Sequence, residues 1–442
     1  MTLAASTRPR VAAVFCVHHK PWLIMSTLIT TLAQRFPGLD LHFLYNVGIE
    51  GQHTSPHHRE YQELIGAFGQ TNSHLDPYDG SVKEVCDVAW PNVRHWEYEN
   101  DQGLDSGAWY KFIRGGAWRE YDYVFFLGEG ALFARPHALQ AIVDFAESSG
   151  AQFIASGHEK RRLSRRQFLP EEPDLQFATP MERFSRRMIR ESFEIFARDP
   201  DFRGVFDKWD SVGPRIRTEN HVPDIWGRAW PWRRLINAAT GSYERVGGTG
   251  VRGQIKRAVI EQTEMLLAIE NACAPVIQRT LGPFPERIHV DGALHVRDQV
   301  VEVVEKDGVR FHREQTPEWL GCGVIHLLGN RFLETLDARM TQYQMYEVLD
   351  LPFAASGLEV IWGFLPSWLG FEKWFTDGIH RVRKNFVTHR REDDAAGMAW
   401  YINRYYEGLL QVVADGEHIK LRRLSPQLAS LPDALNHFYR DE

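Results

Sequence analysis

The pattern of apolar and polar positions at the start of the chain predicts a strand, a helix and a second strand. Residues 11–17 form a continuous apolar run, which is typical of a strand buried on both faces. Pro21 suits the first turn of a helix, and apolar positions recur at helical spacing through residues 24–36. Gly38 ends that helix, and residues 39–45 alternate as the second strand. Together they predict a βαβ unit, which brings two parallel strands into one sheet.

The alternation of strands and helices continues through the first third of the chain. After a polar stretch, the pattern predicts a strand at 93–98, a helix at 106–118, a strand at 123–127, a helix opening at Pro136 and a strand at 152–156. Such alternation predicts an α/β fold with a mostly parallel sheet flanked by helices.

Beyond this α/β part the pattern becomes irregular and then helical. Residues 255–274 read as an amphipathic helix, and Asp307-Gly308 marks a tight hairpin within strands at 287–311. We therefore expect an α/β region, a second region with an irregular arginine-rich insertion, and a helical, aromatic-rich C-terminal region. Their expected ranges are 8–157, 158–330 and 331–442.

Composition adds few constraints. Of the 442 residues, 43% are hydrophobic and 25% are charged, as in ordinary globular proteins. The net charge of −7 argues against a whole-protein nucleic-acid binder. The four cysteines are scattered without zinc-site spacing, and no run reaches the roughly 18 apolar residues of a membrane span. Since the first residues also lack a signal-peptide core, we expect a cytoplasmic protein with buried thiols and no nucleic-acid partner.

A Gly-Glu-Gly turn after the strand at 123–127 is the most informative feature of the chain. An open α/β sheet binds ligands at the carboxyl ends of its strands, so Glu129 stands where a cation or a phosphate-bearing substrate would be handled. Gly128 and Gly130 leave room for the close approach of a ligand. A solvated turn carboxylate is the alternative interpretation.

The order of these motifs resembles that of GT-A-type nucleotide-sugar glycosyltransferases over roughly residues 8–157. That family opens with a strand, a polar loop and a helix, as VAAVFCVHHKPWLIMSTLITTL does here, followed by LHFLYNVG. Its acidic strand end is matched in position by LeuGlyGluGly at 127–130. Its Asn/Asp-rich loop before a helix is matched by Asn100, Gly103, Asp105 and Ser106. The resemblance implies a GT-A-like (Rossmann-like) fold and a nucleotide-diphosphate sugar as donor.

The resemblance also implies which residues meet the donor. His18 would lie at the base, Asn46 at the nucleoside, and Asp105 with Ser106 at the ribose or base. Lys111 would contact a phosphate. The alternatives are a structural histidine at a strand end, a helix N-cap at Asp105-Ser106 and a solvated lysine.

The metal site departs from the family pattern. The family usually holds Mg²⁺ or Mn²⁺ with two aspartates, whereas this chain has Glu129 alone. One carboxylate plus the diphosphate would suffice for Mg²⁺, which keeps several waters. Equally, arginines or lysines would neutralise the leaving group without a metal. Some members of the family use a late histidine as metal ligand, and His326 would fill that role beside Glu129. A buried, hydrogen-bonded histidine is the alternative.

The catalytic base would come from the second region. An inverting enzyme needs a base for the acceptor hydroxyl, and the family places it near the start of a helix after the acceptor loop. Glu261 and Glu264 are three residues apart and share a helical face, as ordinary surface charges also do. Asp291 is a further candidate, with a turn residue as its alternative.

Two basic features bear on the acceptor and on membranes. The arginine clusters at 161–166 and 186–190 would bind a diphosphate, an anionic acceptor or a lipid phosphate, unless they are solvated faces. The run 358–386 sets aromatic residues beside Arg381 and its basic neighbours, as a membrane-lying segment does. Packing against the α/β region is the alternative.

The sequence thus predicts a glycosyltransferase that moves a sugar from a nucleotide-diphosphate donor to a glycan, lipid-linked or cell-envelope acceptor, as in polysaccharide biosynthesis. Two alternatives stay open. One is a GT-A-like glycan-binding or assembly protein that has lost the metal site. The other is a nucleotidyltransferase, which would normally carry a glycine-rich phosphate loop where this chain has HisHisLysPro (18–21).

Overall fold

The structure is a computed structural model, and the strands of its described residues form one large sheet and four small ones. It describes residues 8–17, 21–47, 57, 59–60, 63, 93–99, 104–128, 131–133, 135–156, 160–162, 180–209, 287–290, 293–296, 300–314, 319–321, 325–352, 354–381, 399–400, 402–403, 406–415 and 418–425. The large sheet contains β1 (Val11–Val17), β2 (Leu39–Val47), β3 (Val93–Glu99), β4 (Tyr123–Leu127), β6 (Phe153–Ser156), β10 (Val300–Lys306), β11 (Val309–Glu314), β13 (Ile325–Gly329) and β14 (Lys373–Thr376). The two-stranded sheets pair β5 (Ala131–Phe133) with β15 (Ile379–Arg381), β7 (Lys160–Arg162) with β12 (Trp319–Gly321), β8 (Arg287–Val290) with β9 (Ala293–Val296), and β16 (Leu410–Asp415) with β17 (His418–Leu424).

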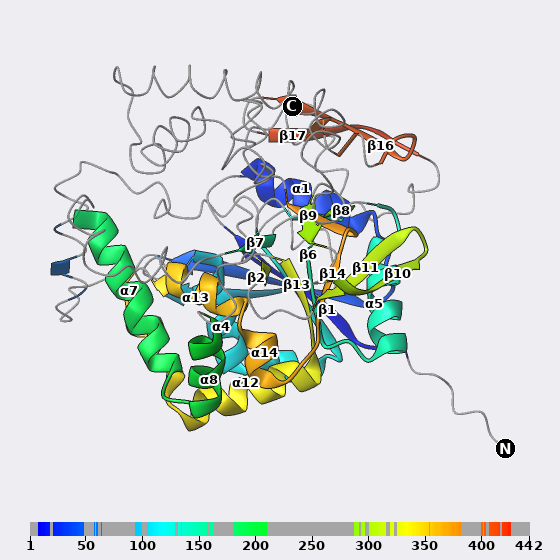
Figure 1. Ribbon diagram of the computed structural model, residues 1–442. Coiled ribbons are helices and arrows are strands. Elements are labelled where there is room, and N and C mark those ends of the chain that lie inside the picture. Colours follow the sequence, from blue (N-terminus) through cyan, green and yellow to red (C-terminus); the bar gives the residue numbers. More distant parts are fainter. Residues whose placement is uncertain are drawn as a thin grey trace, which may run out of the picture.

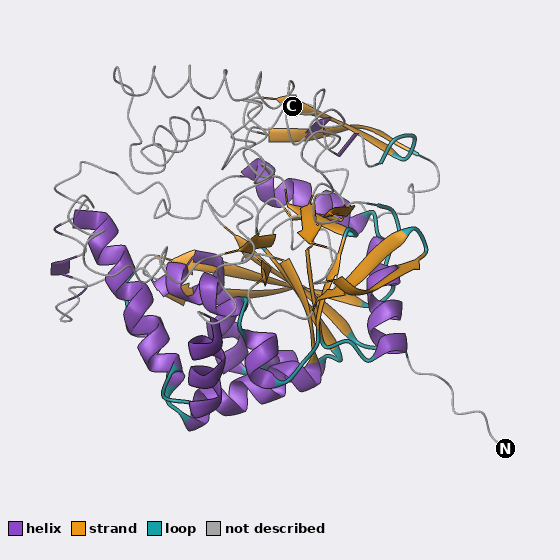
Figure 2. Cartoon of the chain, viewed as in Figure 1, coloured by secondary structure: helices purple, strands orange, loops and turns teal. Residues whose placement is uncertain are grey.

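Helices pack on both faces of the large sheet (Figure 2). The α-helices of the described part are α1 (Pro21–Leu32), α4 (Leu104–Gly115), α5 (Ala138–Ser149), α7 (Pro180–Phe196), α8 (Pro200–Trp209), α12 (Asn330–Gln342), α13 (Ala354–Trp362) and α14 (Leu365–Leu369). Two short 3₁₀ helices are η2 (Ala117–Glu120) and η6 (Met345–Asp350).

The large sheet has nine described strands in the order β10-β11-β14-β6-β13-β4-β1-β2-β3 (Figure 1). β1 runs parallel to both β2 and β4, β2 to β3, and β14 to β6. β13 is antiparallel to its neighbours β4 and β6, and β11 is antiparallel to β14 and β10. Among the described strands, therefore, only β11 and β13 run against the rest. The predicted α/β fold with a mostly parallel, helix-flanked sheet is confirmed.

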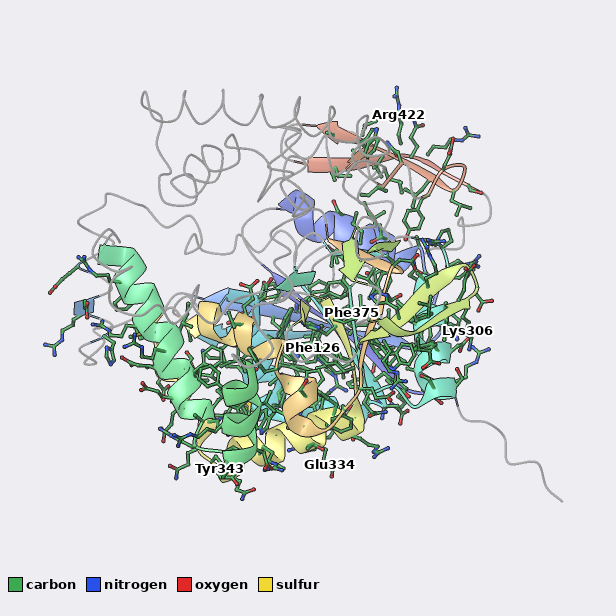
Figure 3. The ribbon with its side chains drawn as sticks, in the orientation of Figure 1. Phe126, Lys306, Glu334, Tyr343, Phe375 and Arg422 are labelled. Atoms are coloured by element: carbon green, nitrogen blue, oxygen red, sulfur yellow. The ribbon has the colours of Figure 1, made fainter. Side chains whose placement is uncertain are left out.

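Alternation along the strands divides the core between two layers. Phe126 of β4 packs against Trp109 of α4, with ring centroids 5.6 Å apart. The preceding residue, Phe125, packs instead against Phe133 of β5, at 5.7 Å. Helices α4, α12, α13 and α14 thus cover one face, and β5 with α1 and α5 covers the other (Figures 1 and 2). Phe126 and Phe375, labelled in Figure 3, lie among the buried side chains of the first layer.

Several predicted elements agree with the structure at their ends. β1 and β4 have the predicted bounds, and Asp307 and Gly308 adopt the positive φ values of +51° and +75° in the turn between β10 and β11. The helix predicted at 106–118 instead ends at Gly115, because Gly116 turns left-handed at φ +76° before η2. The amphipathic helix predicted at 255–274 lies outside the described residues.

The C-terminal third differs from the expectation. Helices occupy much of residues 330–369, but strands β14 to β17 follow, and β14 belongs to the large sheet. The run Lys373–Thr376 is too short to show a period, so its pattern does not distinguish helix from strand. Strands from all three expected ranges belong to the one large sheet.

The aromatic run that suggested a membrane-lying segment is core. Trp362, Phe364, Trp368, Trp374 and Phe375 are all buried in the hydrophobic cluster around the large sheet. The packing interpretation therefore accounts for them, and this burial gives no support for membrane contact through them. None of the helices in the described part has the length and apolar character that crossing a bilayer needs.

Candidate functional site

The carboxyl ends of four neighbouring parallel strands lie side by side at one edge of the large sheet. Leu127 of β4 pairs with Phe15 of β1, and Val17 of β1 pairs with Tyr45 of β2. Further along, Val47 of β2 pairs with Glu99, the last residue of β3. The strands end at this edge in the order β4, β1, β2, β3, and we call it the carboxyl edge. Such an edge is where open α/β sheets bind their ligands.

Several predicted donor-binding residues lie in these four strands or follow them in the sequence. His18 directly follows β1 in the sequence but lies outside the described residues. Asn46 is in β2, where its backbone pairs with Tyr98 of β3. The described chain resumes after β3 at α4, so Asp105 and Ser106 stand at the amino end of that helix. The fold thus brings segments from four separate parts of the sequence to one edge.

Asp105 and Ser106 are held firmly in the first turn of α4. Both are buried, with exposed fractions of 7% and 3%. A carboxylate at this end is stabilised by the helix dipole, which supplies a structural reason for Asp105 independent of any ligand. One turn further on, Trp109 and Phe112 pack edge-on against Phe126 with centroids 5.6 Å and 6.0 Å away, which fixes the helix to the sheet.

Lys111 is not at the carboxyl edge. It is partly exposed and lies six residues beyond Asp105, which is about 9 Å along the axis of α4 and away from the helix start. A phosphate held at the amino end of α4 would meet Asp105 and Ser106 before it met this lysine.

The described residues on either side of Glu129 and Gly130 are buried. β4 ends at Leu127, Gly128 follows it, and the backbone N–H of Ala131 donates to the carbonyl of Gly128 at 3.1 Å. Glu129 and Gly130 lie outside the described residues, and so the side chain of Glu129 stays a prediction. The described ranges contain no group of three or more His, Cys, Asp or Glu side chains arranged to hold a metal.

His326 lies in an aromatic environment within the first core layer. It pairs in register with Phe126 of β4, and its ring stacks on Trp362 with centroids 5.1 Å apart. Trp109 and Phe153 pack at 6.1 Å and 5.2 Å. Burial, assisted by the charge of Lys373, lowers the pKa of His326 to about 3, so the ring is neutral.

Both ring nitrogens of His326 lack a hydrogen-bond partner among the described residues. The alternative expectation was a buried and hydrogen-bonded histidine. The burial is confirmed, but no hydrogen bond is formed with the described residues. Metal ligation with Glu129 stays a prediction, and it would require a cation to enter between aromatic rings. A neutral imidazole is the form that binds metals.

The candidate bases are not among the described residues. Glu261 and Glu264 fall in the range 210–286, for which the structure describes nothing, and Asp291 falls between β8 and β9. Their roles stay predictions.

The sequence pattern did not predict two short strands that carry basic residues, β7 and β15. β7, of sequence Lys-Arg-Arg, lies three residues after β6 and pairs with β12, which ends shortly before β13. β15 ends in Arg381 and pairs with β5, directly after the Glu129 turn. The sequence signal was the basic character of each segment, but nothing local showed which strand it would join.

Comparisons with known proteins give no family assignment. No protein-family model matches the chain, and no curated protein matches it. Among solved structures, it is similar to the mannosyltransferase PcManGT from Pyrobaculum calidifontis in complex with GDP-Man and Mn²⁺, with 14% identity and a TM-score of 0.22. That match covers 37% of each chain, so this chain spans little more than a third of that protein. It is also similar to residues 1–349 of TarS from S. aureus, with 12% identity and a TM-score of 0.24, over 65% of this chain and 96% of that one.

Proposed function

We propose that the protein is a glycosyltransferase that binds a nucleotide-diphosphate sugar across the carboxyl ends of β4, β1, β2 and β3. One observation carries the proposal. Four adjacent parallel strands end together, with a buried acidic helix start after β3, and in the sequence Glu129 follows β4 by two residues. This is the arrangement in which an open α/β sheet receives a nucleotide, and the motif order resembles GT-A enzymes.

The residues have different tasks in this proposal. The carboxylate of Asp105 accepts a hydrogen bond from the ribose or base, and the hydroxyl of Ser106 donates one to it. Both residues have a fixed position in the first turn of α4 before a ligand binds. Asn46 and His18, from the neighbouring strand ends, complete the nucleoside contacts. Glu129 acts at the diphosphate end, because it follows the strand on the other side of β1. The donor would then lie along the edge with its nucleoside over β1–β3 and its sugar towards β4.

The predicted metal ligands, Glu129 and His326, suit a divalent cation only in part. Glu129 would hold it with phosphate oxygens and waters, as Mg²⁺ or Mn²⁺ coordination allows, while the aromatic surroundings of His326 do not favour it as a second ligand. A bound cation would neutralise charge on the leaving diphosphate. Glu261, Glu264 and Asp291 remain the candidates for the base that takes the proton of the acceptor hydroxyl. The acceptor in this proposal is a glycan, lipid-linked or cell-envelope molecule.

The first test is a ligand panel. UDP-, GDP-, TDP- and CMP-linked sugars are screened for an increase in melting temperature, with and without Mn²⁺, because a ligand that binds only the native state stabilises it. At least one nucleoside-diphosphate sugar is expected to stabilise the protein. Stabilisation by glycans alone would instead favour the glycan-binding alternative.

The second test is a matched pair of variants. Glu129→Gln is expected to lower turnover of the donor by ~100-fold or more, the size seen when one electrostatic contact to the transition state is removed. Glu334→Gln, an exposed glutamate of α12 at the periphery in Figure 3, is the control and should retain full activity. Both variants should melt like the parent protein. Full turnover in Glu129→Gln would remove the acid-bearing turn from the mechanism.

A further inference from the structure

Three aromatic rings in the core layer that contains α4 contact one another and carry polar atoms without a partner. Trp109 of α4, His326 of β13 and Trp362 of α13 pack with ring centroids 5.1 to 6.1 Å apart. Among the described residues, the indole nitrogens of both tryptophans and both ring nitrogens of His326 have no hydrogen-bond partner. Four unpartnered polar atoms thus belong to one group of touching rings, which we call the indole–imidazole cluster.

Bulk solvent does not reach the indole–imidazole cluster. Trp109 and Trp362 are fully buried, and His326 is 1% exposed. A buried donor or acceptor without a partner keeps the full penalty of losing its water, so native proteins rarely leave such a group unpaired. Four such atoms on touching rings therefore indicate a polar occupant that the rings share.

The protonation state of His326 decides what this occupant must offer. Burial, assisted by the charge of Lys373, lowers the pKa of His326 to about 3, so the ring is neutral. A neutral imidazole has one N–H donor and one accepting nitrogen, and each indole adds one N–H donor. Trp109 packs edge-on against both other rings, and a ring face is a weak acceptor for an N–H group. A ring face donates no proton, however, so the accepting nitrogen of His326 still lacks a donor.

Neither an anion nor a metal cation suits this set of donors and acceptors. An anion would accept from the N–H groups but would leave the accepting nitrogen of His326 without a donor. A cation would bind that nitrogen, but it would face the N–H donors and would be repelled by Lys373, whose charge already disfavours a second positive charge on His326. Lys373 is itself buried, and its Nζ donates to the carbonyl of Gly363 at 2.6 Å. The cluster therefore requires a neutral molecule that both donates and accepts.

We propose that the indole–imidazole cluster binds a buried water molecule, which donates to His326 and accepts from the indole N–H groups. Internal waters typically make about three hydrogen bonds to buried polar groups that have no other partner, which matches this set. The water would link α4, β13 and α13. The inference does not depend on the proposed function. It bears on that function in one respect: a nitrogen that accepts from water is not available to a metal, so a cation at the donor diphosphate would be held without His326.

The first test is a matched pair of variants, His326→Gln and His326→Met. The two new side chains are similar in size and shape, but only the amide can both donate to a water molecule and accept from it. Urea unfolding is followed at neutral pH. The equilibrium constant for unfolding should be lower in His326→Gln than in His326→Met by ~5-fold or more, the size of one net hydrogen bond. In a dry cluster the order would be the reverse, because the amide would be buried without partners.

Leu328 supplies the control for this comparison. It is fully buried two residues further along β13, on the same face as His326, and its side chain has no polar atom to hydrate. Leu328→Met should therefore be more stable than Leu328→Gln. If the His326 pair ranks in the same order as the Leu328 pair, the indole–imidazole cluster is dry and the inference is wrong.

A crystal structure of the full chain, grown with MnCl₂, tests the occupant directly. We expect an ordered water within hydrogen-bonding distance of one ring nitrogen of His326 and of at least one indole nitrogen of Trp109 or Trp362. Rings in contact without density between them, or an anomalous manganese peak at His326, would overturn the inference. Neither result touches the nucleotide-sugar panel, so the proposed function stands or falls separately.

Discussion

Tyr406 ties the C-terminal part of the chain to the layer that carries the candidate site, and its hydroxyl can be removed without changing the ring. The residue is fully buried, and its Oη donates to the carbonyl of Phe133 in β5 at 2.6 Å. It accepts a hydrogen bond from Nε2 of Gln34, just beyond α1, at 2.8 Å. Burial raises the pKa of Tyr406 well above its ordinary value, so the hydroxyl remains a donor at every working pH.

The cost of Tyr406→Phe depends on which partners lose a hydrogen bond. Nε2 of Gln34 also donates to the carbonyls of Thr30 at 3.1 Å and Arg135 at 3.0 Å, so its two N–H groups keep acceptors. Phe133 loses this donor to its carbonyl, and no cavity forms. One lost buried hydrogen bond predicts a destabilisation of about 1–2 kcal/mol rather than the sum of two bonds.

Gln34→Leu should lower the free energy of unfolding more than Tyr406→Phe does. Besides the three bonds from Nε2, its Oε1 accepts the backbone N–H of Leu139 in α5 at 3.0 Å, so the variant strips partners from several buried groups. We expect about 2–4 kcal/mol, and a double variant less costly than the sum, because the two residues share a bond. Urea unfolding followed by tryptophan fluorescence gives all three values. Tyr343→Phe, at a partly exposed site, is the control and should stay within about 0.5 kcal/mol of the parent. A Tyr406→Phe protein as stable as its parent, or less stable than Gln34→Leu, would refute this accounting.

Two further predictions concern buried charge and pH. Asp377→Asn should lower the free energy of unfolding, measured in urea, by about 2 kcal/mol. The buried carboxylate pairs with Arg135 and Arg310, but both arginines are about 40% exposed, so solvent partly screens the pairs. If the difference in unfolding free energy disappeared in 0.5 M salt, the burial of this carboxylate would be contradicted. His326→Phe should flatten the pH dependence of stability. The native pKa of about 3 is below the ordinary 6.5, so the native ring stays neutral while the unfolded one gains a proton, and stability is full above pH 6.5 and falls as the pH drops towards 3. Each such histidine contributes about 1.4 kcal/mol per pH unit in that window, and His42, with a pKa of about 4, supplies a second share. Parallel curves for His326→Phe and its parent between pH 7 and 5 would contradict the assignment.

The sequence could predict those strands that form a distinct local pattern. β1 and β4 are continuous apolar runs bounded by polar residues, and they have the predicted ends. The strand after Asp307-Gly308 was equally predictable, because a turn with two positive φ angles requires such residues. The residues directly after each strand are also a local feature of the chain, so the candidate donor residues could be named.

The neighbours of each strand could not be predicted in this way. β13 enters the sheet antiparallel between β4 and β6, so His326 is surrounded by Trp109, Phe153 and Trp362, which come from three distant segments. β15 pairs with β5 in one register, and contacts of Ser156 and Asp377 hold it there, which strand propensity alone does not specify. Partner and register are decided by tertiary packing.

The opposite, amino edge of the same strands is built for stability. Trp96 can only donate, and its Nε1 lies 3.0 Å from Nδ1 of His42, so the neutral ring carries its proton on Nε2. That nitrogen donates to the hydroxyl of Tyr121 at 2.9 Å, which in turn donates to Asp40 at 2.9 Å. Every donor in this chain of hydrogen bonds has an acceptor within the protein.

The charged groups at the amino edge are also paired with one another. Arg94 makes two hydrogen bonds of 2.9 Å to Glu120, and Arg10 lies 3.6 Å from the same carboxylate. The backbone N–H of Arg10 is bound to Asp122 at 2.7 Å. A ligand at this edge would have to break existing bonds to make its own. These bonds join β3 to η2 and the start of β1 to the start of β4, so the amino edge contributes to the stability of the fold.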